Sequence, residues 1–278
     1  MKQESGISKI WRLFYPMLTA MGIQLVISSI AGMILSAMVL VNTAPLNETT
    51  MFTALMEASV KYAVLITGIS CLFTIPLSLL FYKRDLKLNK INPTKHTVPA
   101  YCWPPLIITG ILTCIGSNII ITISQLDLYF SSYEQVSEQL YSGNFIVQLI
   151  VIGFIAPISE ELIFRGLIYN RAKAYFGTIY AVIVSSLIFA FYHGNAIQFI
   201  YALIIGLMMA YIYEKFGTLM APVIFHICCN LPALILQQMH ITINSLYTAA
   251  YIATGCTAAV VILFFIMHKI LKSQSNKQ

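Results

Sequence analysis

The chain has 278 residues, of which 59% are hydrophobic and only 9% are charged. Soluble domains carry about 25% charged residues, so the composition excludes a soluble globular domain and indicates a polytopic membrane protein. The net charge of +6 does not indicate a nucleic-acid partner, because the basic residues lie in short loops between apolar runs. In a membrane protein such loop charges set the orientation of the helices.

Spanning helices need about 20 apolar residues, and the chain offers eight such runs, the fifth of them short. We therefore expect an all-α fold, a polytopic membrane helix bundle of about eight transmembrane helices. The first run is too long for the apolar region of a cleavable signal peptide, so we expect a retained helix. The predicted spans are 13–42, 58–82, 100–125, 143–169, 178–193, 195–214, 218–240 and 247–268.

The loop charges predict the topology. If eight helices alternate, nearly all basic loop residues fall on one side, and by the positive-inside rule both termini are cytoplasmic. The opposite side carries acidic residues and the polar, aromatic loop 126–142, which we expect to form an amphipathic helix on the outer surface. The basic residues on the first side are Lys2, Lys9, Arg12, Lys83, Arg84, Lys87, Lys90, Lys95, Arg171, Lys173, Lys215, Lys269, Lys272 and Lys277; the acidic ones opposite are Glu48, Asp127, Glu134 and Glu138.

Two adjacent glutamates, Glu160 and Glu161, interrupt the apolar segment 145–169. Each charge at the centre of a spanning helix costs about 2.5–3.5 kcal/mol even on the mildest scale. Glu161 and Arg165 have the favourable i,i+4 order and predict a buried pair that fixes helix packing. Glu160 points about 100° away and has no partner in its own helix, so it is the residue hardest to explain structurally.

Polar groups also recur on two later helices, as Phe189-x-x-x-His193 and His226-x-x-x-Asn230. If these groups converge with Glu160, they suit hydrolysis: a carboxylate takes a proton from water, a histidine positions that water, and histidine or asparagine donors hold the oxyanion. The structural alternative is interhelical hydrogen bonding, worth about 1 kcal/mol for each bond.

Three motifs in this order, E-E-x-x-x-R, F-x-x-x-H and H-x-x-x-N, resemble the CAAX protease and bacteriocin-processing (CPBP, or Abi) family of intramembrane proteases, which includes type II CAAX prenyl endopeptidases. The resemblance spans about 143–240. It implies that Glu160 and His193 activate water, that His226 and Asn230 stabilise the oxyanion, and that Glu161, Arg165 and Phe189 support them. We therefore divide the chain into N-terminal helices (1–142), catalytic helices (143–240) and a last helix with a basic tail (241–278).

The predicted activity is that of an intramembrane endopeptidase acting on a membrane-associated peptide or protein, in peptide maturation or bacteriocin immunity. We favour a mechanism without a cofactor, and the alternative is a zinc site built from Glu160, His193 and His226. Two other functions stay open: a non-catalytic immunity or scaffold protein, and a proton-coupled transporter that uses Glu160. The expected partners are membrane lipid and the substrate, and the sequence does not fix the oligomeric state. The Ile-, Asn- and Tyr-rich composition favours a bacterial cell membrane.

The predicted helix bounds place the candidate catalytic residues at different depths in the membrane. Counted at 1.5 Å per residue from the cytoplasmic helix ends, Glu160 and His226 lie roughly 12–15 Å deep, whereas His193 lies near 22 Å. Helix five must therefore tilt, start inside the membrane, or begin later than residue 178.

Overall fold

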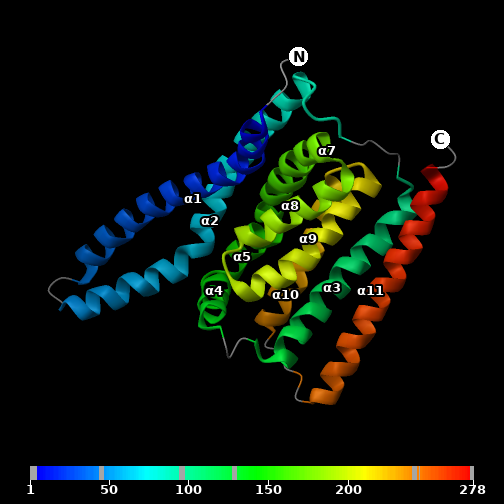
Figure 1. Cartoon of the computed structure of the whole chain (residues 1–278). Coiled ribbons are helices and arrows are strands. Elements are labelled where there is room, and N and C mark those ends of the chain that lie inside the picture. The colour runs from blue at the N-terminus through cyan, green and yellow to red at the C-terminus, as the bar shows by residue number, and fades with distance from the viewer. Residues whose placement is uncertain are drawn as a thin grey trace.

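The computed structural model describes residues 5–43, 47–93, 98–126, 130–239, 243 and 245–275. Within these ranges the chain is helical and contains no strand (Figure 1). The N-terminal helices are α1 (Gly6–Thr43), α2 (Glu48–Lys87), η1 (Ala100–Cys102), α3 (Trp103–Ser124) and α4 (Ser131–Tyr141). The remaining elements are α5 (Phe145–Ile150), η3 (Val151–Ile155), α6 (Ala156–Glu161), η4 (Leu162–Tyr169), α7 (Asn170–Phe176), α8 (Thr178–Tyr192), α9 (Ala196–Phe216), α10 (Met220–Gln238) and α11 (Leu246–Ser275).

The predicted fold class, an all-α membrane bundle, is confirmed. Seven helical stretches among the described residues are long and apolar enough to cross a membrane, and the continuous stretch Phe145–Phe176 combines α5 to α7 into one of them. The eighth apolar helix, α8, has only 15 residues, as expected for the fifth span.

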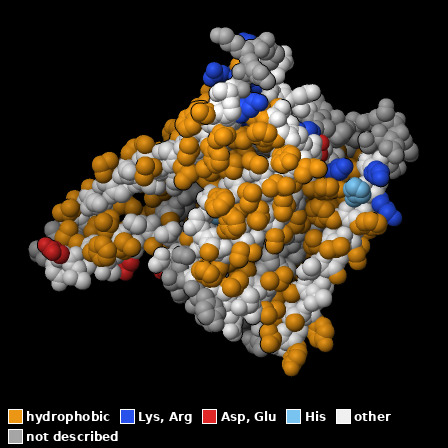
Figure 2. All heavy atoms as spheres, viewed as in Figure 1, with side chains coloured by type: hydrophobic (Ala, Val, Ile, Leu, Met, Phe, Trp, Pro, Cys, Tyr) orange, Lys and Arg blue, Asp and Glu red, His pale blue; other side chains and the backbone are white. Residues whose placement is uncertain are grey.

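The helices are arranged as a central bundle with two pairs at its sides (Figure 1). α1 and α2 form a hairpin whose connecting end diverges from the bundle, and α11 packs along α3 on the other side. α8 and α9 lie side by side in the middle, and α10 packs on α3. A broad hydrophobic surface covers the face shown in Figure 2, as expected for a chain surrounded by lipid.

The Lys and Arg side chains visible in Figure 2 gather at one end of the molecule, the end marked N and C in Figure 1. Two ion pairs connect α1, α2 and α7 there, because Asp85 accepts from Arg12 at 2.8 Å and from Arg171 at 2.6 Å. The common location of these described basic residues agrees with the prediction, while the side of the membrane that this end faces stays a prediction. Lys2, Lys95, Asp127 and Lys277 lie outside the described residues.

Helix four was predicted to end at residue 169, and this boundary is wrong. The helix continues without a break through α7 to Phe176. From Phe176 back to Glu160, and from Thr178 forward to His193, the helices rise by about 24 and about 22 Å at 1.5 Å per residue. Glu160 and His193 therefore reach the same level, and the difference in depth between these two residues came from the misplaced helix end.

The predicted amphipathic helix in the loop 126–142 is present as α4. It does not lie only on a surface, since it packs against α2, α5 and α9. Five residues of α4 line a cavity in the bundle: Tyr133, Val136, Gln139, Leu140 and Tyr141. The side chain of Glu134 is not among those that the structure describes.

The close contact between α3 and α10 depends on Gly110. A Cβ atom at this position would lie 2.6 Å from the Cβ of Cys228 and 2.9 Å from the carbonyl oxygen of Phe225. Gly110→Ala is therefore expected to push the two helices apart and to lower the free energy of unfolding by about 1–3 kcal/mol. Unfolding in detergent measures this loss. Gly32→Ala is the control, because nothing lies within 4 Å of its added Cβ, and equal stability of the two variants would contradict the prediction.

Candidate active site

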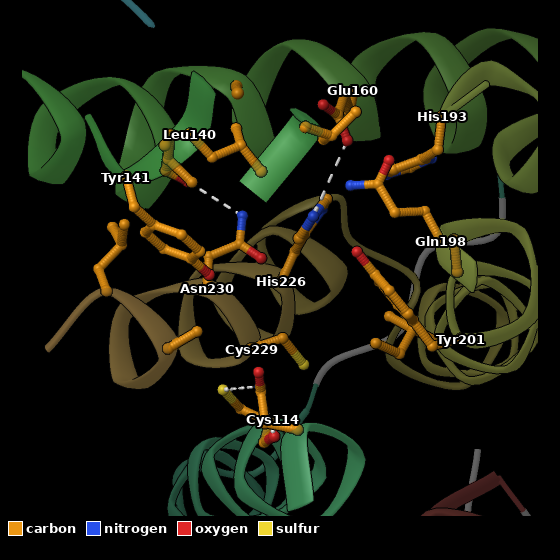
Figure 3. A pocket seen from close by; sticks show the side chains of 18 of the residues that line it. Cys114, Leu140, Tyr141, Glu160, His193, Gln198, Tyr201, His226, Cys229 and Asn230 are labelled. Atoms are coloured by element: carbon orange, nitrogen blue, oxygen red, sulfur yellow. Dashed lines mark hydrogen bonds and ion pairs between the residues drawn. The ribbon is translucent and has the colours of Figure 1, made fainter. Parts of the chain in front are cut away.

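A cavity of about 290 Å³ is lined by residues of α2, α3, α4, η3, α6, α8, α9 and α10. The four predicted catalytic residues, Glu160, His193, His226 and Asn230, all line it. Figure 3 shows Glu160 and His193 on one side of the cavity and His226 and Asn230 on the other. The structure thus brings together residues that are up to 70 positions apart in the sequence.

The helix that carries Glu160 is wound irregularly around this position. A π-helical segment, η3, precedes α6, and a second one, η4, follows it. Pro157 stands in the first turn of α6, where it supplies no backbone N–H and favours a change of hydrogen-bonding pattern. π-Helical turns are frequent at functional sites, and here they set the direction in which Glu160 and Glu161 project.

Glu161 and Arg165 form the predicted pair. Arg165 Nη1 donates to Glu161 Oε1 at 2.9 Å, and both side chains are fully buried. Arg165 also donates through Nη2 to the carbonyl oxygen of Gly206 on α9, at 3.0 Å. Its guanidinium lies 4.7 Å from the ring centroid of Phe189, in the range of a cation–π contact. Neither residue lines the cavity, so the pair joins helices behind the site.

His226 connects the two glutamates. Its Nδ1 lies 3.0 Å from Glu161 Oε1, and its Nε2 lies 3.8 Å from Glu160 Oε2. A carboxylate accepts hydrogen bonds, so Nδ1 carries a proton and Nε2 is the nitrogen that faces Glu160. Glu160 therefore has a partner after all, on another helix, as Figure 3 shows.

His193 is oriented by its own helix. It follows α8 directly, and its Nδ1 lies 2.9 Å from the carbonyl oxygen of Phe189. A carbonyl oxygen can only accept, so the proton is on Nδ1 and Nε2 keeps its lone pair. Phe189 also contacts the His193 ring, at 4.7 Å between centroids, and the His226 ring at 5.8 Å. The F-x-x-x-H spacing thus orients one imidazole by a hydrogen bond and packs both.

Asn230 lines the cavity, but its amide is engaged. Nδ2 donates to the carbonyl oxygen of Ile152 at 3.0 Å, which lies within the π-helical segment η3. This bond joins α10 to the irregular helix. In this arrangement Asn230 keeps one amide hydrogen for another acceptor.

Several polar side chains of the cavity escaped the sequence analysis, among them Gln198 and Tyr201 on α9 and Tyr141 on α4. Figure 3 shows the Gln198 amide pointing toward Glu160 and His226. Burial raises the pKa of Tyr141 to about 12, so its hydroxyl stays protonated. The only sequence signal was the short distance between His193 and Gln198, which is not specific.

A zinc site does not fit these side chains as they are arranged. Among the described residues, no group of three His, Cys, Asp or Glu side chains lies close enough together to hold a metal ion. We therefore derive no step through a metal.

Comparison with known proteins finds similarity over this segment of the chain. Residues 142–232 match the model of the family described as "Type II CAAX prenyl endopeptidase Rce1-like". A protein of Bacillus subtilis (strain 168) named "Putative membrane peptidase YdiL" is 26% identical over 91 residues, which are 33% of this chain and 37% of the relative. The match thus spans little more than a third of that relative. No solved structure matches the chain.

Proposed function

We propose that this chain, whose residues 142–232 belong to the family of CPBP and type II CAAX proteases, is an intramembrane endopeptidase that uses a glutamate to activate water. The segment that matches the family contains all four predicted catalytic residues, and the cavity of about 290 Å³ accommodates a short extended piece of peptide. We propose a membrane-associated peptide or protein as the substrate, cleaved during peptide maturation or in bacteriocin immunity.

In this mechanism Glu160 and His193 act on the water from one side. Glu160 takes one proton from the water while Nε2 of His193 accepts a hydrogen bond from the other. The water oxygen then adds to the carbonyl carbon of the peptide bond, and the carbonyl oxygen becomes an oxyanion. When the C–N bond breaks, Glu160 returns its proton to the leaving amine.

The oxyanion lies on the opposite side of the cavity in this proposal. Nε2 of His226, when protonated, and the remaining amide hydrogen of Asn230 are the donors that the family resemblance assigns to it. Glu161 is a positioning residue, because it fixes the His226 ring through Nδ1 at 3.0 Å. Donors fixed before the reaction stabilise the transition state most effectively, since they need no reorganisation.

The observation that carries the proposal is the convergence of Glu160, His193 and His226 on one cavity. The test is incubation of the purified chain in detergent with a library of membrane peptides, with and without a zinc chelator, and identification of products by mass spectrometry. We expect cleavage that resists the chelator. Loss of cleavage with the chelator and its recovery with zinc would contradict the metal-free mechanism. If the chain cleaves no peptide of the library, the scaffold or transporter functions are favoured.

Gln198 is a further candidate donor to the oxyanion. Its side-chain amide points into the cavity toward Glu160 and His226 (Figure 3). We expect Gln198→Ala to lower kcat by about 10²-fold or more, with little change in KM, as for other oxyanion donors. Steady-state kinetics separates the two parameters. Gln148→Ala is the control, since Gln148 donates to Ser142 O outside the cavity; equal kinetic effects would refute this role.

A further inference from the structure

One wall of the active-site cavity is a face of α3 that the proposed mechanism does not use. It also lies outside residues 142–232, which match the family. The residues of α3 that line the cavity are Cys114, Ser117, Asn118 and Ile121, at the spacing of a single helix face. Figure 3 shows Cys114 on the opposite side of the cavity from Glu160. Since this wall and the catalytic residues border the same cavity, a peptide bound at one of them extends to the other.

The two polar side chains of this wall use their hydrogen-bond donors within α3. The hydroxyl of Ser117 donates to the carbonyl oxygen of Thr113 at 2.7 Å. Nδ2 of Asn118 donates to the carbonyl oxygen of Cys114 at 2.9 Å, and it also lies 3.6 Å from the sulfur of that residue. Because a carbonyl oxygen only accepts, this contact fixes which end of the Asn118 amide is the oxygen. What remains for the cavity is therefore acceptors, namely Ser117 Oγ and Asn118 Oδ1.

The protein itself supplies little to these acceptors. Among the described residues, no donor of another side chain or of the backbone reaches Asn118 Oδ1. The described residues that line the cavity include no Lys or Arg either. Both Ser117 and Asn118 are half-buried, and an acceptor in an apolar helix bundle is costly unless a donor meets it. A peptide backbone carries such a donor, the N–H group, at every residue except proline.

We propose that Ser117 and Asn118 form a subsite that accepts hydrogen bonds from backbone N–H groups of the substrate, in the residues that flank the cleaved bond. This inference rests on the proposed protease function. The cavity then binds a peptide from two sides: α10 donates to the carbonyl oxygen of the cleaved bond, and α3 accepts from neighbouring N–H groups. In a helix the N–H groups are already bound within the chain, so the subsite selects an extended segment and reads its backbone, not its side chains.

The test uses a peptide that the wild type cleaves, together with analogues in which one backbone amide at a time, other than the cleaved one, is replaced by an ester that lacks the N–H group. We expect a flanking position at which the ester raises KM about three- to tenfold, the effect of one hydrogen bond. The value of kcat is expected to change little, because the contact is the same in the ground state and in the transition state. Asn118→Ala is expected to raise KM equally for the amide peptide and to abolish the further effect of the ester.

Ser117→Ala is the second variant, and Ser124→Ala is its matched control. Ser124 lies on the same helix and donates to the carbonyl oxygen of Ile121, as Ser117 does to that of Thr113, but it does not line the cavity. We expect KM to rise about threefold or more in Ser117→Ala and to stay unchanged in Ser124→Ala.

The outcomes separate the subsite from the proposed function. Cleavage by the wild type with no position sensitive to the ester would overturn the subsite and leave the protease function intact, and this result does not depend on whether a variant folds. An ester effect as large in Asn118→Ala as in the wild type, or equal KM values for Ser117→Ala and Ser124→Ala, would also overturn it. If the wild type cleaves no peptide, the proposed function itself is refuted, and the subsite with it.

Discussion

Glu160→Gln is expected to lower kcat/KM for peptide cleavage by about 10²–10⁴-fold, the usual contribution of a general base. Glutamine has nearly the same shape as glutamate but cannot take a proton from water. It also fills the same space beside Nε2 of His226, which lies 3.8 Å from Glu160 Oε2, so the helices keep their packing. The fold is therefore expected to survive while the chemistry is lost. Cleavage rates of a peptide identified from the library measure the effect.

Glu57→Gln is the control for removing a carboxylate from this protein. Glu57 is exposed on α2 and does not line the cavity, so its replacement is expected to leave kcat/KM within a factor of about two, since exposed sites away from function are tolerant. If Glu160→Gln cleaves as fast as Glu57→Gln, Glu160 is not the general base, and the scaffold and transporter functions become the better explanations of its place in the helix.

The order and number of the membrane helices were predictable because lipid restricts the alternatives. A spanning segment must satisfy its own backbone hydrogen bonds and must present apolar side chains for about 20 residues. These two requirements predict which segments cross the membrane but not where each helix ends: α2 runs from Glu48 to Lys87, whereas the predicted span was 58–82. The end of helix four was wrongly predicted at Tyr169, because hydropathy falls at the polar residues Asn170 and Arg171 while the helix continues through them.

The candidate site was predictable in part. Glu160, Glu161 and Arg165 stand out because charges are costly in an apolar helix, and the histidines stand out by their spacing. Which partners they meet was not predictable, since His226 reaches Glu161 across 65 positions. The ion pairs of Asp85 were missed for the same reason: Arg171 lies 86 positions away. Nothing local marks these pairs, because helix packing alone brings them together.

Arg165→Met is expected to lower the free energy of unfolding by about 3–5 kcal/mol, the cost of leaving one member of a buried pair alone. Glu161 would lose its cation while remaining fully buried, and α9 would lose the hydrogen bond at the carbonyl of Gly206. Thermal unfolding and unfolding in increasing dodecyl sulfate measure the change. A loss below about 1 kcal/mol, as for an exposed pair, would contradict the structural role.

The double variant Glu161→Gln with Arg165→Met separates stability from function. Removing both charges eliminates the unpaired ion, so we expect most of the lost stability to return. Activity is not expected to return with it, because the carboxylate that accepts from Nδ1 of His226 at 3.0 Å is gone and the ring loses its fixed tautomer. Recovery of both properties would show that Glu161 only balances Arg165. Recovery of stability alone assigns Glu161 two tasks: pairing with the arginine behind the site and orienting the histidine within it.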